Sequence, residues 1–492
     1  MRRNGMLLPI ASLPSPYGIG GFSKEAYEFI DLLEETGQKL WQILPLGPTS
    51  YGDSPYQSFS TFAGNPYFID LDTLAEKGWL TKEACEASDY GDNESYIDYG
   101  RIYNSRFVLL KQAFLNSDIL SDKKFTEFCK ANQHWLPDYA LYMALKNQND
   151  GKSWIEWEEE IRLRKPEAVE YYKKELEEEC NFYEFLQYEF HEQWTKVKEY
   201  AHKKGIQIVG DVPIYVAFDS ADTWANPELF QLDEKNLPLG VAGCPPDAFS
   251  ATGQLWGNPL YNWAYHKKTG YDWWLKRIAY CFDLYDIVRI DHFRGFDEYY
   301  SIPYGDETAV NGHWEKGPGM DLFNTVKEKL GELDIIAEDL GFLTESVFQL
   351  LKDSGYPGMK VLQFAFDPSE DSDYLTYKYQ RNCVVYTGTH DNDTTAGWFE
   401  KLSDGDKEVA LRYMNSFYTP KEEQHWDLIA LAMRSTADTC IIPVQDFLGL
   451  GSEARINMPS TLGDNWKWRM TKGAFSEELK EKIRRMTKLY GR

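Results

Sequence analysis

The sequence has no excess of positive charge, no closely spaced pair of cysteines and no long apolar run. Its 492 residues hold 52 lysines and arginines against 78 aspartates and glutamates, a net charge of −26. The electrostatic field of this negative charge repels phosphate backbones and anionic lipid surfaces, so we expect no nucleic-acid partner and no membrane partner. No segment approaches the roughly 18 apolar residues that a transmembrane helix needs.

The seven cysteines are odd in number and widely spaced, and none forms a C-x-x-C pair. This spacing predicts neither a zinc site nor a disulfide framework, and it favours a reducing, cytoplasmic compartment. The apolar stretch that follows Arg2 and Arg3 is interrupted at Pro9. It is therefore too short for an export signal.

Aromatic residues, in contrast, are abundant. The 16 Trp, 33 Tyr and 27 Phe make up 15% of the chain. Many such rings fill the core of a protein, but flat rings also stack on the C–H faces of pyranose sugars in binding clefts. The aromatic content is therefore the first indication of a sugar ligand.

Eight short apolar segments end in polar residues, and stretches with helical periodicity separate them. Continuous apolar runs of this length are typical of parallel strands that are buried on both faces. Eight strand–helix units predict an α/β fold, a single (β/α)8 TIM barrel that spans residues 1–492. The segments are 5–10, 40–46, 206–215, 286–294, 334–341, 359–366, 383–391 and 440–449.

The spacing of these segments is uneven and predicts where the barrel is interrupted. The region 71–205 is rich in Glu, Lys, Tyr and Trp at helical spacing, and we interpret it as a mostly helical insertion. The region 218–263 holds many Gly, Pro, Asp and Asn residues, which is typical of a long irregular loop. Long ordered loops are commonly functional.

Carboxylates stand at the ends of three of the predicted strands. Arg289 and Asp291 are two residues apart and point to the same side, where the arginine favours the ionised carboxylate that a nucleophile requires. Glu338 leaves a buried strand, and desolvation there can raise its pKa to that of a general acid. His390 and Asp391 follow the apolar run of another strand, in a polar turn.

Each of these residues also has a purely structural interpretation. Arg289 and Asp291 could form an ion pair inside the barrel, and His390 could be an ordinary loop histidine. Glu338 and Asp391 could cap helices. Together they favour catalysis, because catalytic residues of such barrels lie at the C-terminal ends of several strands. Three carboxylates at one mouth fit a site that cleaves glycosidic bonds, with a nucleophile, an acid/base and a group that stabilises the transition state.

The three carboxylates belong to an ordered set of seven segments: GDSPYQSFSTFAGNPY (52–67), GDVPIYVAFDSADTW (210–224), GCPPDAFSATGQLWGNPLYNW (243–263), VRIDHFRGF (288–296), IIAEDLG (335–341), YTGTHDNDTT (386–395) and RINMPSTLGDNWKWR (455–469). This set resembles the amylomaltase family, the 4-α-glucanotransferases also called disproportionating enzymes, and the match runs from Leu8 to Arg469. The resemblance implies an α-amylase-like barrel with inserted subdomains and no separate C-terminal β-domain. It also implies that the loop 218–263 folds over the active site.

The resemblance implies a role for each residue of the three strand ends. Asp291 matches the nucleophile of the family, and Glu338 matches its acid/base. Asp391 matches the carboxylate that grips the hydroxyls of the distorted donor ring. Arg289 matches the arginine beside the nucleophile, and His390 matches the histidine of the donor subsite.

Five further residues match substrate-binding positions of the family. Asp211 and Tyr56 belong to the donor subsite, where Tyr56 would stack on the sugar. Trp256 lies in the covering loop, where it could also pack inward and only support the loop. Tyr51 lies where the family has an aromatic residue of a remote glucan-binding groove. Asn457 lies near the last strand.

These roles imply a retaining transferase that acts on α-1,4-glucans and maltooligosaccharides, with glucose or a glucan as acceptor or with closure to a cyclic glucan. Double displacement requires no redox, phosphate or metal step, so we expect no cofactor and no metal. Two alternatives stay open. An α-amylase-like hydrolase would use the same carboxylates with water as acceptor. A non-catalytic glucan-binding protein would keep the aromatic residues without a need for all three carboxylates.

Overall fold

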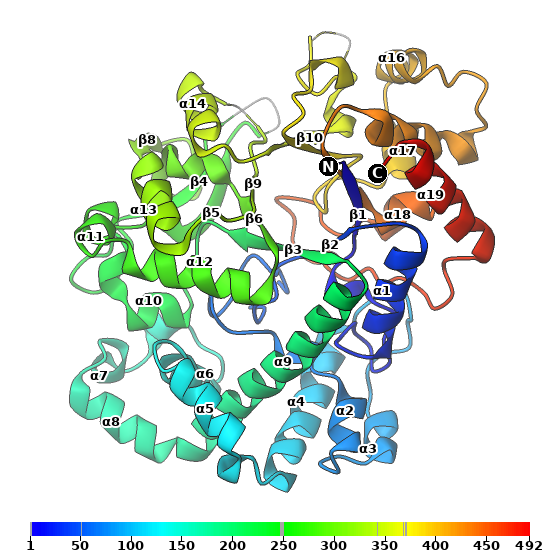
Figure 1. Cartoon of the computed structure of the whole chain (residues 1–492). Coiled ribbons are helices and arrows are strands. Elements are labelled where there is room, and N and C mark those ends of the chain that lie inside the picture. The colour runs from blue at the N-terminus through cyan, green and yellow to red at the C-terminus, as the bar shows by residue number, and fades with distance from the viewer. Residues whose placement is uncertain (1, 51, 247–249, 342, 368, 370) are drawn as a thin grey trace.

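The protein is described here by a computed structural model that covers residues 2–50, 52–246, 250–341, 343–367, 369 and 371–492. Its centre is a parallel eight-stranded sheet that forms a nearly closed (β/α)8 barrel (Figure 1), in the order β10-β11-β12-β1-β2-β3-β6-β9. The backbone N–H of Ala337 donates to the carbonyl of Pro357 (2.9 Å) between the two end strands. The strands are β1 (Arg3–Leu7), β2 (Leu40–Gln42), β3 (Gln207–Pro213), β6 (Ile287–Asp291), β9 (Ile335–Ala337), β10 (Gly358–Val361), β11 (Cys383–Tyr386) and β12 (Thr439–Pro443).

The predicted barrel is confirmed, and each of the eight predicted segments contains one of its strands or overlaps it. The runs are apolar because both faces of each strand are buried. One set of side chains fills the barrel, and the alternate set packs outward on the helices. Burying one large aliphatic side chain contributes about 1.5–3 kcal/mol to stability. The cluster within the barrel includes Leu7, Leu40, Val209, Ile287, Ile336, Met359, Val361, Val384 and Ile441.

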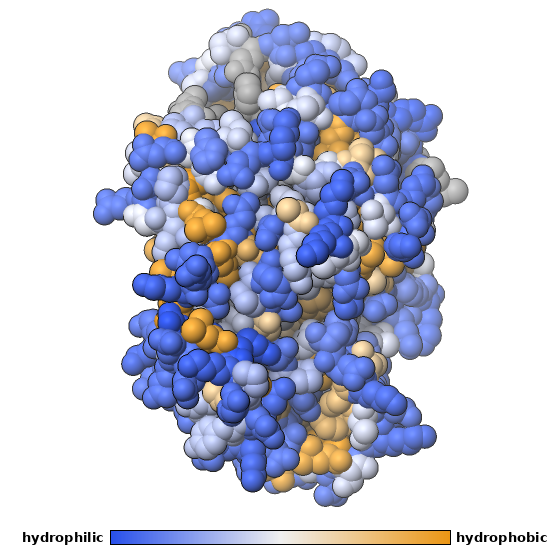
Figure 2. Space-filling model, turned by 90° about the vertical axis from the view of Figure 1, so that its left-hand side faces the viewer, coloured by the Kyte–Doolittle hydropathy of each residue, from blue (hydrophilic) through white to orange (hydrophobic). Residues whose placement is uncertain are grey.

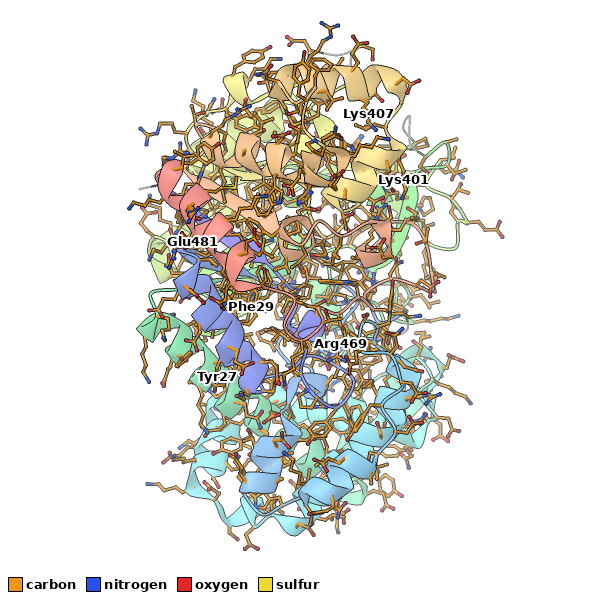
Figure 3. The ribbon with its side chains drawn as sticks, turned by 90° about the vertical axis from the view of Figure 1, so that its right-hand side faces the viewer. Tyr27, Phe29, Lys401, Lys407, Arg469 and Glu481 are labelled. Carbon is orange, nitrogen blue, oxygen red and sulfur yellow. The ribbon has the colours of Figure 1, made fainter. Side chains whose placement is uncertain are left out.

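Helix α1 (Lys24–Glu35) shows how the outer layer packs (Figure 3). Its buried positions recur at helical spacing, and Phe29 among them lies 5.0 Å from Trp41 of β2 between ring centroids. Tyr27 points to the side and meets Tyr200 edge to face at 5.1 Å. The outer layer also contains α11 (Trp263–Lys268), α12 (Asp272–Leu284), α13 (Met320–Leu330), α14 (Glu345–Ser354), α15 (Thr395–Lys401), α16 (Asp404–Met414), α17 (Gln424–Arg434), α18 (Val444–Phe447) and α19 (Glu477–Leu489).

The region 71–205, all of it described, contains helices and no strand. It forms the lower part of the molecule in Figure 1. The long helix α9 joins it to the barrel, because its first half packs on α6 and its last half carries the buried Trp194, whose indole N–H donates to Leu284 of α12 (3.0 Å). The helices are α2 (Leu71–Glu76), α3 (Lys82–Ala87), α4 (Tyr99–Asn116), α5 (Lys123–Ala131), α6 (Leu136–Gln148), α7 (Glu159–Arg162), α8 (Pro166–Glu175) and α9 (Glu177–Lys203).

The region 218–263 is more regular than the sequence indicated. It contains α10 (Ala221–Ala225), β4 (Gly240–Cys244) and β5 (Gln254–Pro259). These strands join β7 (Glu298–Pro303) and β8 (His313–Lys316) in an antiparallel sheet of order β5-β4-β7-β8. Glycine and proline within GVAGC and QLWGNP weaken the strand signal, and the partner strand β7 lies outside the region.

The described residues outside these regions add no further sheet. Residues 444–492, all of which the structure describes, contain no strand, as expected for a chain without a C-terminal β-domain. The face shown in Figure 2 is largely hydrophilic, with hydrophobic side chains scattered in small groups. In the described part of the chain, no helix has the length and apolar character needed to cross a membrane.

Candidate active site

Strand β6 brings Arg289 and Asp291 to the same mouth of the barrel. Nη1 of Arg289 donates to both carboxylate oxygens of Asp211 on β3 (2.8 and 2.7 Å) and to Oδ1 of Asp291 (3.0 Å). Arg289 and Asp211 are buried, whereas the side chain of Asp291 keeps 30% of its surface exposed. Arg289 therefore forms ion pairs with both carboxylates, including the pair with Asp291 that the sequence left open. Asp291 remains accessible beside the same cation.

Glu338 follows β9, the neighbour of β6 in the barrel. Its Oε2 accepts from the backbone N–H of His292 (2.6 Å), and its Oε1 accepts from that of Leu340 (2.8 Å). Its main chain is also held, because its N–H donates to Ile290 (3.0 Å) and its carbonyl accepts from Phe293 (3.1 Å). Glu338 is therefore fixed directly to the strand end that carries Asp291.

The surroundings raise the pKa of both carboxyl groups. Burial raises the pKa of Glu338 to about 7, and the charge of Asp291 adds to the rise. Burial raises the pKa of Asp291 to about 6 against the opposing effect of Arg289. The expected stabilisation of the ionised Asp291 by Arg289 is present but weaker than desolvation. Near neutral pH, Glu338 is thus the partner that keeps the proton more readily.

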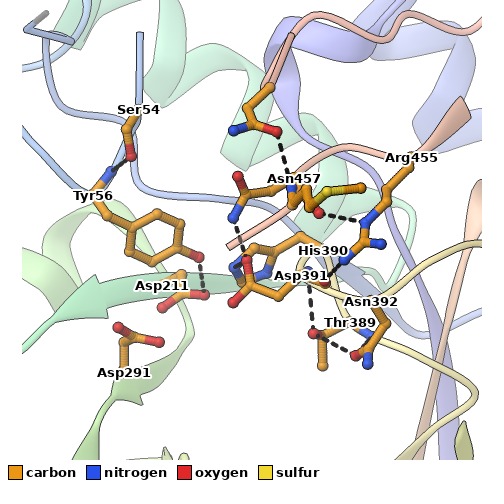
Figure 4. Close-up of polar contacts among 12 residues, drawn as sticks. Ser54, Tyr56, Asp211, Asp291, Thr389, His390, Asp391, Asn392, Arg455 and Asn457 are labelled. Atoms are coloured by element: carbon orange, nitrogen blue, oxygen red, sulfur yellow. Dashed lines mark hydrogen bonds and ion pairs between the residues drawn. The ribbon is translucent and has the colours of Figure 1, made fainter. Parts of the chain in front are cut away.

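Asp391 lies in the turn after β11, on the other side of the mouth (Figure 4). Its Oδ1 accepts from Nδ2 of Asn457 (2.6 Å) and lies 3.4 Å from Nε2 of His390. Arg455 holds the backbone of both Asp391 and Asn457, because its guanidinium group donates to the carbonyls of Asp391 (2.6 Å) and Asn457 (2.7 Å). The side chain of Asp391 is 43% exposed, so it is held in orientation and still open to a ligand.

Tyr56 connects the two sides of the mouth. Its hydroxyl donates to Oδ2 of Asp211 (2.9 Å), and its ring stacks on His390 with centroids 5.1 Å apart and planes 17° apart. Trp466 lies 5.7 Å from Tyr56 and 6.1 Å from His390 between ring centroids. Sequence reasoning did not single out Trp466, although it lies in the segment 455–469 that carried the resemblance. The structure therefore brings together Tyr56, Asp211, Arg289, Asp291, Glu338, His390, Asp391 and Asn457.

Trp256 lies on β5 of the antiparallel sheet and contacts the residue that follows Asp291. Its ring meets that of His292 edge to face, with centroids 4.8 Å apart, and its indole N–H donates to Gln254 (3.1 Å). His292 was also missed by sequence reasoning. Its backbone adopts a left-handed conformation (φ 56°), which cannot be predicted from the pattern of residues. Tyr51 lies outside the described residues.

The arrangement suits the cleavage and formation of glycosidic bonds. It combines a partly exposed carboxylate beside a cation, a second partly buried carboxyl group with a raised pKa, and a third carboxylate held by an amide. Stacked rings complete the mouth, as in clefts that bind sugars. Within the described residues, no group of three or more His, Cys, Asp and Glu side chains is placed to hold a metal ion.

Comparison with known proteins decides the family. A family model described as 4-alpha-glucanotransferase matches residues 8–475. The chain belongs to the 4-alpha-glucanotransferase family. A 4-alpha-glucanotransferase of Clostridium butyricum is 54% identical over 485 residues, which cover 98% of this chain and 99% of that protein. One of Thermus thermophilus is 46% identical over 494 residues, which cover 99% and 98%.

A solved structure agrees with this assignment. The amylomaltase of Streptococcus agalactiae in complex with acarbose is 43% identical, with a TM-score of 0.96 over 100% of both chains. The predicted family, barrel fold and glucanotransferase activity are thereby confirmed. The comparisons favour transfer over both alternatives, the glucan hydrolase and the non-catalytic glucan-binding protein.

Proposed function

We propose that the barrel mouth transfers α-1,4-glucan segments by retaining double displacement. Asp291 attacks the anomeric carbon of the donor while Glu338 protonates the leaving 4-oxygen, which releases the shorter glucan and leaves a covalent glycosyl-enzyme. Glu338 then removes the proton from the 4-hydroxyl of an acceptor, glucose or another glucan. That oxygen displaces Asp291, and the configuration at the anomeric carbon is retained.

One observation supports this assignment above the others. Buried Arg289 contacts two carboxylates, but only Asp291 keeps an exposed side chain. Glu338 is fixed to the adjacent strand end with a pKa raised to about 7. We therefore assign Asp291 as the nucleophile and Glu338 as the acid.

The remaining residues fit the binding of the donor ring. Asp391, oriented by Asn457, is placed to grip sugar hydroxyls and to favour the charge that develops on the ring at the transition state. Tyr56 presents an aromatic face whose orientation is set by Asp211 and His390. Trp256, on the side of His292, would order the acceptor and keep water from the glycosyl-enzyme.

The proposed substrates are neutral, which agrees with an acidic protein that would repel nucleic acids. Six of the cysteines, Cys85, Cys129, Cys180, Cys281, Cys383 and Cys440, have free thiols, which supports the proposed reducing, cytoplasmic location.

Incubation with maltotriose tests the reaction. We expect glucose together with a series of longer oligosaccharides. Glucose and maltose without longer products would contradict transfer. The mechanism is tested with the Glu338→Gln variant and α-maltosyl fluoride, whose leaving group needs no proton. A maltosyl adduct should accumulate on the peptide that contains Asp291, and an adduct on another carboxylate would refute the assignment.

A further inference from the structure

The segment that carries Tyr56 is held in place by chain that lies outside the barrel. The carbonyl of Phe59 accepts from the backbone N–H of Ala221 (2.8 Å). The backbone N–H of Thr61 donates to Oδ2 of the buried Asp222 (2.8 Å). Both partners belong to α10, in the connection that leaves β3. We call residues 56–61 the Tyr56 segment. These two hydrogen bonds attach it to the connection that leaves β3.

A single carboxylate joins the same connection to the helical insertion. Oδ2 of Asp219 accepts from Nζ of Lys146 (2.5 Å), and Oδ1 accepts from the hydroxyl of Tyr142 (2.6 Å) and the backbone N–H of Trp154 (3.2 Å). Lys146 and Tyr142 both come from α6, and Lys146 is only 4% exposed. A buried ammonium group requires such partners, so this contact holds α6 against the connection. We call Lys146, Tyr142 and Asp219 the insertion clamp.

The insertion clamp also touches the Tyr56 segment directly. Nζ of Lys146 lies 4.9 Å from the ring centroid of Phe59, within the range of a cation–π contact. The ring of Tyr142 lies 6.3 Å from the same ring. Phe59 is three residues beyond Tyr56 and is thus enclosed between α6 and the backbone that carries Tyr56. The contacts of Phe59 and the backbone between Tyr56 and Phe59 thus link the helical insertion to the aromatic face of the mouth.

We infer that the insertion clamp positions the donor subsite: Lys146 and Asp219 set the orientation of Tyr56 through Phe59, although neither is placed to touch the sugar. The inference rests on the proposed function, because it takes Tyr56 as the ring that stacks on the donor. The helical insertion then contributes to catalysis by holding this ring. Misplacing a group that orients substrate by about 1 Å can reduce a rate on the order of 100-fold. A smaller loss is expected here, because Asp211 and His390 still hold Tyr56.

A double-mutant cycle between the insertion clamp and Tyr56 tests the inference. Lys146→Met keeps the apolar stem and removes the charge, and kcat/KM for maltotriose should fall by about tenfold. In a Tyr56→Ala background the same substitution should have little further effect, because no ring remains to be oriented. Lys146→Arg keeps the charge and a donor for Asp219, so it should restore most of the activity.

Lys111→Met is a matched control within the insertion. Nζ of Lys111 also binds a carboxylate, that of Glu179 (2.7 Å), and lies 4.8 Å from the ring centroid of Phe182. Because neither partner belongs to the Tyr56 segment, kcat/KM should stay within about twofold of wild type. Melting temperatures and circular dichroism of all variants show whether each one is folded at the assay temperature.

The outcomes separate this inference from the proposed function. If Lys146→Met lowers kcat/KM by the same factor in both backgrounds, the insertion clamp gives only general support and the inference is overturned. If Tyr56→Ala alone leaves kcat/KM unchanged, the donor role of Tyr56 fails, and the inference fails with it. If Lys146→Met does not fold, Tyr142→Phe, which removes only the hydroxyl bond to Asp219, is carried through the same cycle and judged by the same criterion.

Discussion

At the scale of single residues, the site depends on the contrast between two carboxylates that share Arg289. Asp211 is fully buried against Arg289, whereas Asp291, the proposed nucleophile, keeps 30% of its side chain exposed beside the same cation. Asp291→Asn should lower kcat for maltotriose transfer by about 1,000-fold or more, because an amide is nearly isosteric but a poor nucleophile. The circular dichroism spectrum should stay unchanged. Retention of about a tenth of the wild-type kcat would show that another residue attacks.

The raised pKa values of the pair predict the pH dependence of activity. The pKa of Asp291 is raised to about 6 and that of Glu338 to about 7, so kcat/KM should be highest between these values. Activity falls at lower pH as Asp291 is protonated, and at higher pH as Glu338 loses its proton. With α-maltosyl fluoride as donor, formation of the glycosyl-enzyme should lose the alkaline limb. An alkaline limb that persists for this step would exclude Glu338 as the acid.

The same shifts predict an effect on stability. A carboxyl group whose folded-state pKa is raised binds more protons in the folded than in the unfolded protein, so its contribution favours folding as the pH decreases from about 7 toward about 5. Glu338→Gln removes a partly desolvated charge and should therefore raise the melting temperature at pH 8, with a smaller rise at pH 5. The two differences are compared by calorimetry. A rise of equal size at both pH values would mean that packing, and not charge, is responsible.

Sequence reasoning reached the carboxylates of the site because each follows an apolar run, and such runs locate strand ends. The resemblance supplied Tyr56, Asp211 and Asn457. The contacts of His292 and Trp466 were not predictable from periodicity or composition. Both residues have positive φ values (56° and 66°), a local backbone conformation that neither periodicity nor composition indicates.

At the scale of elements, the antiparallel sheet β5-β4-β7-β8 supplies Trp256, whose ring contacts His292, the residue after Asp291. No pattern in the sequence indicated this sheet, because its strands come from two separate regions and contain glycine and proline. The eight barrel strands were found because their side chains are buried on both faces. A strand with one partly exposed face, such as β5, has no comparable apolar run.

The proposed acceptor role of Trp256 on this sheet predicts an effect on the balance between transfer and hydrolysis. Trp256→Ala should weaken acceptor binding by about 1–3 kcal/mol and raise the ratio of hydrolysis to transfer. The ratio is measured on one maltooligosaccharide as reducing sugar released per transfer. Trp314→Ala is the matched control, because Trp314 lies on β8 at the opposite edge of the same sheet. If both variants change the ratio equally, or neither changes it, Trp256 only supports the sheet.

At the scale of the whole molecule, the net charge of −26 acts on folding more than on substrate binding. Like charges distributed over the surface repel one another and destabilise the compact state, and salt screens this repulsion over about 10 Å at 0.1 M. Raising the concentration of sodium chloride from about 0.02 M to about 0.5 M should therefore raise the melting temperature. The KM for maltotriose should change little, because the substrate is neutral. A melting temperature that falls with salt would show that surface ion pairs outweigh the repulsion. A large change in KM would show that charge at the mouth contributes to sugar binding.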